Sequence, residues 1–183
     1  MTMDRRTLLA TGGAFAFGAA ALAAVESGVT PAEAASRDNG LEAELLRIFD
    51  ELDFDVYSNQ KWERIGESHS PNIRVHWPDG HITEGIAQHV ADLKQPFVFA
   101  PNTRVTAHPL KIAKGNMTAV TGIASGTFTR PMPKGDGTFI QPTGKTFVMN
   151  MCTVGIWNPV TKTMDEEYLF NDQKSFMDQL GIG

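Results

Sequence analysis

Two carboxyl side chains near the C-terminus, those of Glu166 and Asp172, fall at alternating positions among apolar and aromatic residues. Alternate residues of a β-strand point to the same face of a sheet, which predicts one shared face for Met164, Glu166, Tyr168, Phe170 and Asp172. Burial beside apolar groups raises the pKa of a carboxyl group, so that it can donate or accept a proton near neutral pH. We therefore expect Glu166 or Asp172 to be a general acid or base that faces an apolar cavity.

The same two carboxyl groups also have a purely structural interpretation. Asp172 precedes a segment expected to be helical and would cap its N-terminus. Glu166 would then lie at the rim of the sheet, paired with an arginine such as Arg104. The two interpretations differ in where the side chains point. If neither carboxyl group faces the cavity, the acid–base hypothesis fails.

Histidines supply further candidates for proton transfer. His76 lies on a short expected strand, where it would donate a hydrogen bond either to a developing oxyanion or only to the adjoining turn. His108 lies in the middle of another expected strand and is a candidate for lining the cavity. We expect His69 and His89 at the surface.

A metal site is not expected. His76, Asp79 and His81 have side chains of the ligand type, but the turn at 78–80 separates them, and a tight turn rarely brings three ligands together. The only cysteine, Cys152, excludes a disulfide within the chain and any site built from several cysteines. We therefore expect no metal and no cofactor.

The segment 146–157 indicates what kind of ligand the cavity would hold. Met149 and Met151 share a face of this expected strand, and methionine side chains suit a flat hydrophobic ligand or plain core packing. Aromatic residues near a helix junction would cover the cavity mouth or pack in the core. The residues expected to contact a small hydrophobic ligand are Tyr57, Trp62, His108, Met149, Met151, Tyr168 and Phe170.

Size and composition narrow the class of protein. The chain has 183 residues, of which 42% are hydrophobic, and a formal net charge of −5. That length is enough for one domain with a core of its own. The acidic balance excludes a nucleic-acid binder, which needs a basic surface. The second face of segment 146–157 is also largely apolar, which predicts a homodimer formed through the sheet.

The N-terminus has the pattern of an export signal. Arg5 and Arg6 precede a run of mostly Ala, Gly, Leu and Phe residues at 8–25, which resembles a twin-arginine signal. We expect residues 1–34 to be removed, 35–40 to form a flexible lead and 41–183 to form the domain. The twin-arginine translocase would be a partner during export, and the protein would be periplasmic or secreted.

The expected elements define an α+β fold. Pattern and turn signals predict helices over 41–58, 61–68, 85–95 and 173–180. They predict strands over 73–77, 82–84, 102–113, 117–130, 146–157 and 163–170, with a loop at 131–145. Helices separated in sequence from an antiparallel sheet are typical of the α+β class.

Motifs at both ends of this domain resemble the SnoaL-like polyketide cyclase, or ester cyclase, group of the nuclear transport factor 2-like superfamily. They are the run from Val75 to Gly80 with Gly85, the run from Thr143 to Phe147 with Trp157, and the tail with Glu166–Asp172 and Gln179-Leu180-Gly181. The resemblance implies a curved antiparallel sheet wrapped around three helices and an apolar pocket open at one end. It also implies one proton-transferring aspartate near the chain end, and Asp172 is the matching position, with Glu166 as its alternative.

Three candidate functions remain open. The first is a cofactor-free enzyme that removes and returns a proton next to a carbonyl group, as ketosteroid isomerase of the same superfamily does in an apolar cavity. The second is a periplasmic binding or carrier protein with the same fold and no chemistry. Export favours the second, because ring closure of antibiotics takes place in the cytoplasm. A hydrolase or dehydratase acting on exported metabolites is a third candidate.

Overall fold

The computed structural model describes residues 31–183, and the compact unit within it runs from Asp38 to Gly183. The expected export signal falls almost entirely outside the described residues. Helix α2 (Pro31–Glu51) includes the segment 35–40 that was expected to be a lead. Among the described residues, no helix combines the length and the apolar character needed to cross a membrane.

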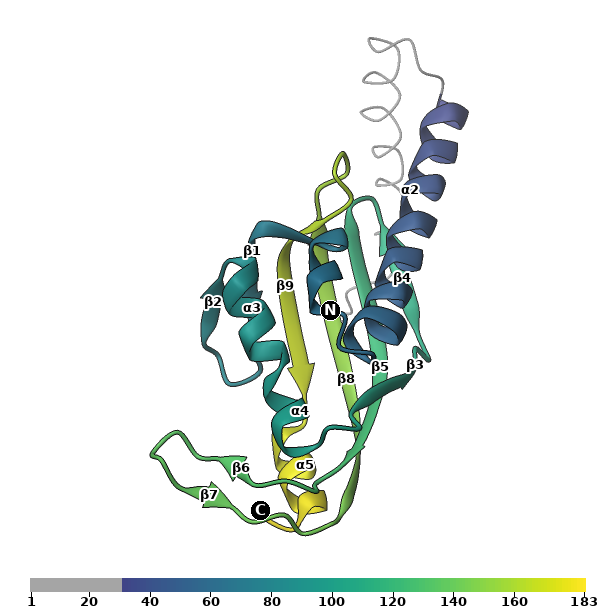
Figure 1. Cartoon of the computed structure of the whole chain (residues 1–183). Helices are drawn as coiled ribbons and strands as arrows, with labels where there is room; N and C mark the ends of the chain where they lie inside the picture. The colour runs from purple at the N-terminus through teal and green to yellow at the C-terminus, as the bar shows by residue number, and fades with distance from the viewer. Residues whose placement is uncertain (1–30) are drawn as a thin grey trace, which may run out of the picture. The chain divides into compact units, whose positions relative to one another are not determined.

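All helices of the unit except the last precede the long strands of the sheet in the chain (Figure 1). Helix α2 continues into a π-helical turn, η1 (Leu52–Tyr57), which is followed by a 3₁₀ helix, η2 (Trp62–Glu67). After two strands come α3 (Ile86–Leu93) and the short α4 (Gln95–Phe99), and α5 (Gln173–Leu180) closes the chain. Pro96 was expected to end a helix, and it instead lies in the first turn of α4, where its missing N–H has no helical partner to lose.

A curved sheet of seven strands forms the second layer. Its strands are β1 (His69–His76), β2 (Ile82–Glu84), β3 (Arg104–Ala107), β4 (Lys111–Lys114), β5 (Met117–Thr127), β8 (Thr146–Trp157) and β9 (Met164–Asn171). The order is β2-β1-β9-β8-β5-β3, with β4 also paired to β5, and only the β1–β9 pairing is parallel. This arrangement confirms the α+β class and the curved sheet.

Two parts of the sheet differ from the sequence-based expectation. The strand expected over 102–113 is divided into β3 and β4, because the segment between them contains Pro109, which has no N–H for the ladder. The loop expected over 131–145 contains a small hairpin of β6 (Met132–Pro133) and β7 (Phe139–Ile140).

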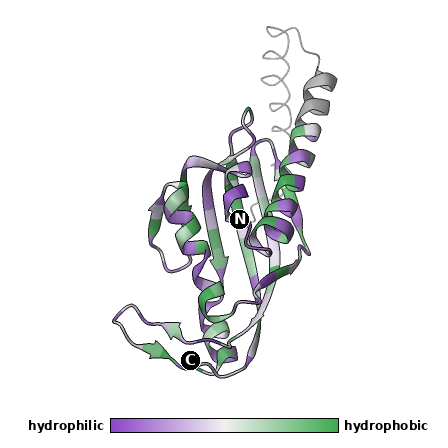
Figure 2. Ribbon diagram, viewed as in Figure 1, coloured by the Kyte–Doolittle hydropathy of each residue, from purple (hydrophilic) through white to green (hydrophobic). Residues whose placement is uncertain are grey.

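The hydrophobic core lies between the sheet and α2. Figure 2 shows hydrophobic and hydrophilic residues alternating along α2, and the buried ones include Leu45 and Phe49. They belong to one cluster with Trp157, whose indole N–H donates to Thr118 Oγ1 at 2.9 Å. A buried indole therefore satisfies its only donor while its ring fills the core.

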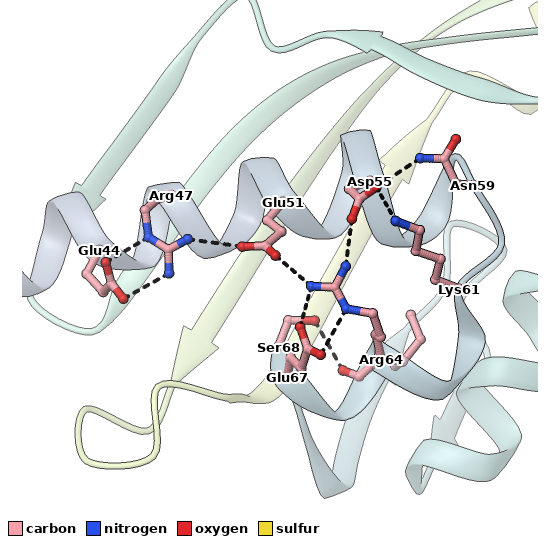
Figure 3. A network of polar contacts seen from close by, with 10 residues as sticks. Glu44, Arg47, Glu51, Asp55, Asn59, Lys61, Arg64, Glu67 and Ser68 are labelled. Carbon is pink, nitrogen blue, oxygen red and sulfur yellow. Dashed lines mark hydrogen bonds and ion pairs between the residues drawn. The ribbon is translucent and has the colours of Figure 1, made fainter.

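A network of ion pairs fixes the outer side of the turn at η1 (Figure 3). Arg64 of η2 binds Glu51 at 2.6 Å, Asp55 at 2.6 Å and Glu67 at 2.7 Å. Arg47 extends the network along α2 by pairing with Glu51 at 3.0 Å. The planar guanidinium of Arg64 thus ties η2 to the end of α2 and to η1.

A β-bulge in β9 changes which side chains point inward. Glu166 pairs with Ile156, but Met164 pairs with Trp157, so Asp165 is an extra residue without a partner on β8. An extra residue reverses the alternation of a strand. Met164 before the bulge and Glu167 after it are therefore both buried, although three positions separate them.

We predict that Gly155→Ala destabilises the protein, because Gly155 pairs with Glu167 in the sheet and has no room for a side chain. An added Cβ would lie 2.7 Å from Met164 Sδ and 2.9 Å from Trp157 Nε1. Overpacking of this kind costs about 1–3 kcal/mol, which urea denaturation would measure. Gly40→Ala is the matched control, because a Cβ at Gly40 meets nothing within 4 Å. Equal stability of the two variants would contradict the packing at Gly155.

Candidate active site

A cavity of about 300 Å³ is enclosed by η1, α3, α4, α5 and the sheet. Its volume is at the lower end of the range for small-molecule sites. Gln95, Phe170 and Gln173 are the exposed residues of the lining and mark its open end, at the starts of α4 and α5 and the end of β9. Much of the wall is apolar, with Leu52, Phe99, Phe147, Met149, Met151 and Phe176.

The carboxyl groups expected in this cavity are not in its lining. Glu166 pairs with Ile156 on the outer face of the sheet, because the bulge at Asp165 reverses the alternation of β9. Asp172 is exposed and caps α5, accepting a hydrogen bond from Ser175 N at 2.9 Å. Placing both groups on an inward face was therefore wrong, and the capping interpretation of Asp172 is confirmed. Acid–base chemistry in the cavity needs other groups.

Glu166 belongs to a cluster on the outer face. His76 Nε2 lies 2.7 Å from Glu166 Oε1, and Tyr168 donates its hydroxyl to the same oxygen at 3.0 Å. The rings of His76 and Tyr168 stack at a centroid distance of 4.0 Å. The partner of Glu166 is thus His76, whereas Arg104 binds Asn59. Exposed hydrophobic residues also lie on the outer face of the sheet. The homodimer in which a second copy of the chain covers this face stays a prediction.

Asp53 is a carboxyl group of the cavity lining that the sequence interpretation missed. It lies at the start of the π-helical turn η1, a type of turn often found at functional sites. Its backbone carbonyl accepts hydrogen bonds from Ser58 N at 3.2 Å and Ser58 Oγ at 2.6 Å. Ser58 Oγ accepts in turn from Val105 N, which fixes the turn against β3. The carboxyl group is therefore held in the cavity wall by a rigid backbone.

His108 lies behind Asp53 and connects it to Asp50. Its Nε2 is 2.9 Å from Asp53 Oδ2, and its Nδ1 is 2.8 Å from Asp50 Oδ1. Lys111 Nζ binds the other oxygen of Asp50 at 2.6 Å. The ring itself packs between Phe49 and Phe54 and is outside the cavity lining, although it was expected to contact a ligand. His108 thus positions a carboxyl group that faces the ligand.

Burial and hydrogen bonding shift the pKa values of Asp53 and His108. Burial raises the pKa of Asp53 above its ordinary value, the hydrogen bond from His108 opposes the rise, and the nearby charge of Glu167 adds to it. Burial by itself would lower the pKa of His108, but its hydrogen bonds with Asp53 and Asp50 outweigh that effect and raise it. When both of its ring nitrogens carry a proton, His108 donates to both carboxylates.

Tyr57 lies one turn after Asp53 and also lines the cavity. Burial, together with the charge of Asp53, raises the pKa of its phenol, so the hydroxyl keeps its proton. Its ring packs edge-on against Trp62 and Phe97, at centroid distances of 6.1 Å and 5.1 Å. Trp62 packs against the ring of Tyr57 but is not itself part of the cavity lining, although it was expected to contact a ligand. A neutral phenol beside a carboxylate can donate a hydrogen bond to a ligand oxygen.

His69 and His89 were expected at the surface, and that expectation is wrong. Each is 1% exposed, and both line the cavity with Glu167. The residue after Glu166 is turned inward by the bulge and faces the two imidazoles, at 3.8 Å from His69 Nε2 and 3.5 Å from His89 Nε2. The alternation of hydropathy along the sequence could not predict the burial of these two histidines, because His69 is the first residue of β1 and His89 lies on the inner side of α3.

The remaining predicted ligand contacts are divided between the two faces of the sheet. Met149 and Met151 lie in the cavity wall. Phe170 pairs with Cys152 and is 55% exposed, and it also contributes to the lining. Tyr168 belongs to the outer cluster and does not contribute. The sequence does contain a signal for Asp53, because Asp50, Asp53 and Tyr57 are three and four positions apart and so share one face of a helix. The acidic residues of this helix were instead expected on its outer face.

Comparison with known proteins places this fold. The profile of the SnoaL-like domain matches residues 53–156, more than half of the chain. The chain belongs to the SnoaL-like domain family, which confirms the resemblance seen in its sequence. No curated protein matches it.

Solved structures agree with the family. A protein from Jannaschia sp. CCS1 that is assigned as a SnoaL-like polyketide cyclase has a TM-score of 0.67 at 18% identity, covering 78% of this chain and 95% of its own. IdmH from Streptomyces antibioticus, assigned as a polyketide cyclase, has a TM-score of 0.63 at 18% identity, covering 75% and 98%. A third, from Acidithiobacillus ferrooxidans, has a TM-score of 0.60 at 18% identity, covering 75% and 92%. At this identity they establish the shared fold.

We predict that His108 titrates above the ordinary histidine value of 6.5. Replacing Asp50 with Asn removes one negative acceptor, so the pKa of His108 should fall. Because the folded-state pKa is raised, the stability from these contacts is present at low pH and is lost as pH rises through that value. Ring ¹⁵N shifts followed by NMR across pH would measure both proteins. A wild-type pKa of His108 at or below 6.5 would contradict the effect assigned to its two carboxylate neighbours.

Proposed function

We propose that the cavity binds a small hydrophobic or aromatic carbonyl compound and that Asp53 removes a proton next to its carbonyl group. The reaction would be of the cyclase or isomerase type. One observation carries the proposal: Asp53 lines an apolar cavity, and only one of its carboxyl oxygens has a hydrogen-bond partner among the described residues, His108. The other oxygen is available to a ligand.

The proposed chemistry uses each neighbour of Asp53 in a defined way. The carboxylate of Asp53 takes the proton, and the electrons of the broken C–H bond form an enolate on the ligand. The hydroxyl of Tyr57 donates a hydrogen bond to the enolate oxygen. In a cyclisation, the enolate carbon attacks a second carbonyl carbon, the electron pair of that C=O bond moves to its oxygen, and this oxygen takes the proton back from Asp53. In an isomerisation, another carbon of the conjugated enolate takes that proton. A raised pKa makes Asp53 a stronger base than a solvated aspartate.

A carrier protein of the same fold is the less favoured candidate. Retention of a hydrophobic ligand needs only the apolar wall. A buried carboxylate that is hydrogen-bonded to a buried histidine adds nothing to such retention, and burying charge has a free-energy cost. The groups at Asp53 therefore support chemistry over transport.

We predict that Asp53→Asn lowers the rate of proton exchange by about 10²–10⁴-fold, the usual contribution of a general base. A thermal-shift screen of aromatic ketones, with α-tetralone as the first probe, would identify compounds that bind. Exchange of their α-protons in D₂O would then be followed by NMR. Asp172→Asn and Glu166→Gln are the matched controls and should keep the wild-type rate.

The pH profile gives a second readout of the same base. The rate should fall as pH drops through the pKa of Asp53, with a midpoint above the ordinary value of 3.8, because burial raises that pKa. His108→Asn removes the hydrogen bond that opposes the rise, so its midpoint should lie higher still. Binding of every hit without exchange in the wild type, or full exchange in Asp53→Asn, would contradict the proposal.

We also propose that the protein is exported by the twin-arginine route, on the pattern at Arg5 and Arg6. In a bacterial host that has this translocase, the double substitution Arg5→Lys and Arg6→Lys should leave the protein in the cytoplasm. Cell fractionation would measure its distribution, and mass spectrometry of the exported form should find Ala35 as the first residue. Export of the doubly substituted protein at the wild-type level would contradict this route.

A further inference from the structure

Polar atoms without hydrogen-bond partners collect in the wall of the cavity. Five such buried side-chain atoms occur among the described residues, and they belong to His69, His89, Asp92, Glu167 and Asn171. All five residues line the cavity. Buried polar atoms are nearly always paired with protein, water or an ion, so these atoms require polar partners inside the cavity that the apolar wall does not supply.

Three of these residues come from three rigid elements and point at one another. Glu167 Oε2 of β9 lies 3.8 Å from His69 Nε2 of β1 and 3.5 Å from His89 Nε2 of α3. One ligand atom from each residue lies within 4.8 Å of the others. Ligand bonds of about 2.0–2.2 Å at tetrahedral angles separate ligand atoms by about 3.3–3.5 Å. The gap between the three side chains therefore has the size of one metal ion.

The contacts of Ser68 allow His69 to present a lone pair to this gap. The hydroxyl of Ser68 lies 3.2 Å from Ile65 O, to which it can donate its only proton. Its oxygen then accepts from His69 Nδ1, which lies at 2.9 Å. In the neutral ring this leaves Nε2 as an acceptor that faces the acceptor Glu167 Oε2. A hydrogen bond from the second ring nitrogen is the arrangement that orients histidine ligands in metal sites.

We propose that His69, His89 and Glu167 bind one divalent transition-metal ion of the Zn²⁺ type. Two imidazoles and one carboxylate are the ligands of catalytic zinc sites that keep a position open, and they suit Mg²⁺ or Ca²⁺ poorly. The open position would face the cavity, where the ion would polarise a ligand carbonyl.

This site differs from the one considered on sequence grounds. The turn with Asp79 and His81 forms a local contact between those two side chains, and His76 pairs with Glu166. The ion would be bound in the wall of the same cavity as Asp53, by residues that the proposed proton transfer does not use. A failure of metal binding would therefore leave the proposed proton transfer intact, and a failure of proton transfer would leave metal binding intact.

The test is metal binding by the purified full-length protein, produced without a histidine tag and stripped with a chelator. Titration with ZnCl₂ against a fluorescent zinc indicator should give one site per chain with a submicromolar Kd. Glu167→Gln should weaken binding by at least about 100-fold, because loss of a ligand exceeds the 10–100-fold loss caused by second-shell changes. Glu166→Gln is the matched control and should bind as the wild type does. Asp53→Asn should also retain zinc.

Two further measurements keep the test decisive if Glu167→Gln does not fold. Ser68→Ala leaves all three ligands in place and should weaken binding by about tenfold, through loss of the hydrogen bond that orients His69. X-ray absorption of the zinc-loaded wild type should show two imidazole ligands and only nitrogen and oxygen neighbours. The proposal is overturned if the wild type binds less than one zinc per chain. It is also overturned if Glu166→Gln weakens binding as much as Glu167→Gln, or if the absorption spectrum lacks imidazole.

Discussion

The extra residue at Asp165 determines the chemistry that the cavity can hold. A strand has only two faces, and one unpaired residue exchanges them for everything that follows. Glu167 is consequently buried and Glu166 is placed on the outer face with His76 and Tyr168. The geometry of a single backbone bulge therefore decides which of two adjacent glutamates belongs to the site.

The two carboxyl groups of the cavity wall differ in their environments. Burial raises the pKa of Asp53 despite its hydrogen bond to His108, which suits a base. Glu167 is also buried, but its carboxyl group faces the imidazoles of His69 and His89, which suits it to share one ligand with them. The same kind of side chain is therefore adapted to two roles by what lies within a few ångströms.

The family fold accounts for the cavity, whereas the proposed function depends on the residues that line it. Membership of the SnoaL-like family and agreement with solved structures at 18% identity establish the architecture. A shared architecture of this kind is compatible with many chemistries. The case for proton transfer therefore depends on Asp53, held by a π-helical turn that Ser58 fixes on the inside and the Arg64 network fixes on the outside.

The sequence by itself determined most of the elements, the α+β class, the inward methionines of β8 and the cap at Asp172. These depend on local information, namely hydrophobic spacing within one segment and the chemistry of turn and cap residues. Only the tertiary structure decided the site. His108 reaches Asp53 across 55 positions, and Glu167 meets His69 and His89 only because a bulge turns it inward. Neither contact has a local signature, since strand register and long-range packing depend on the whole sheet.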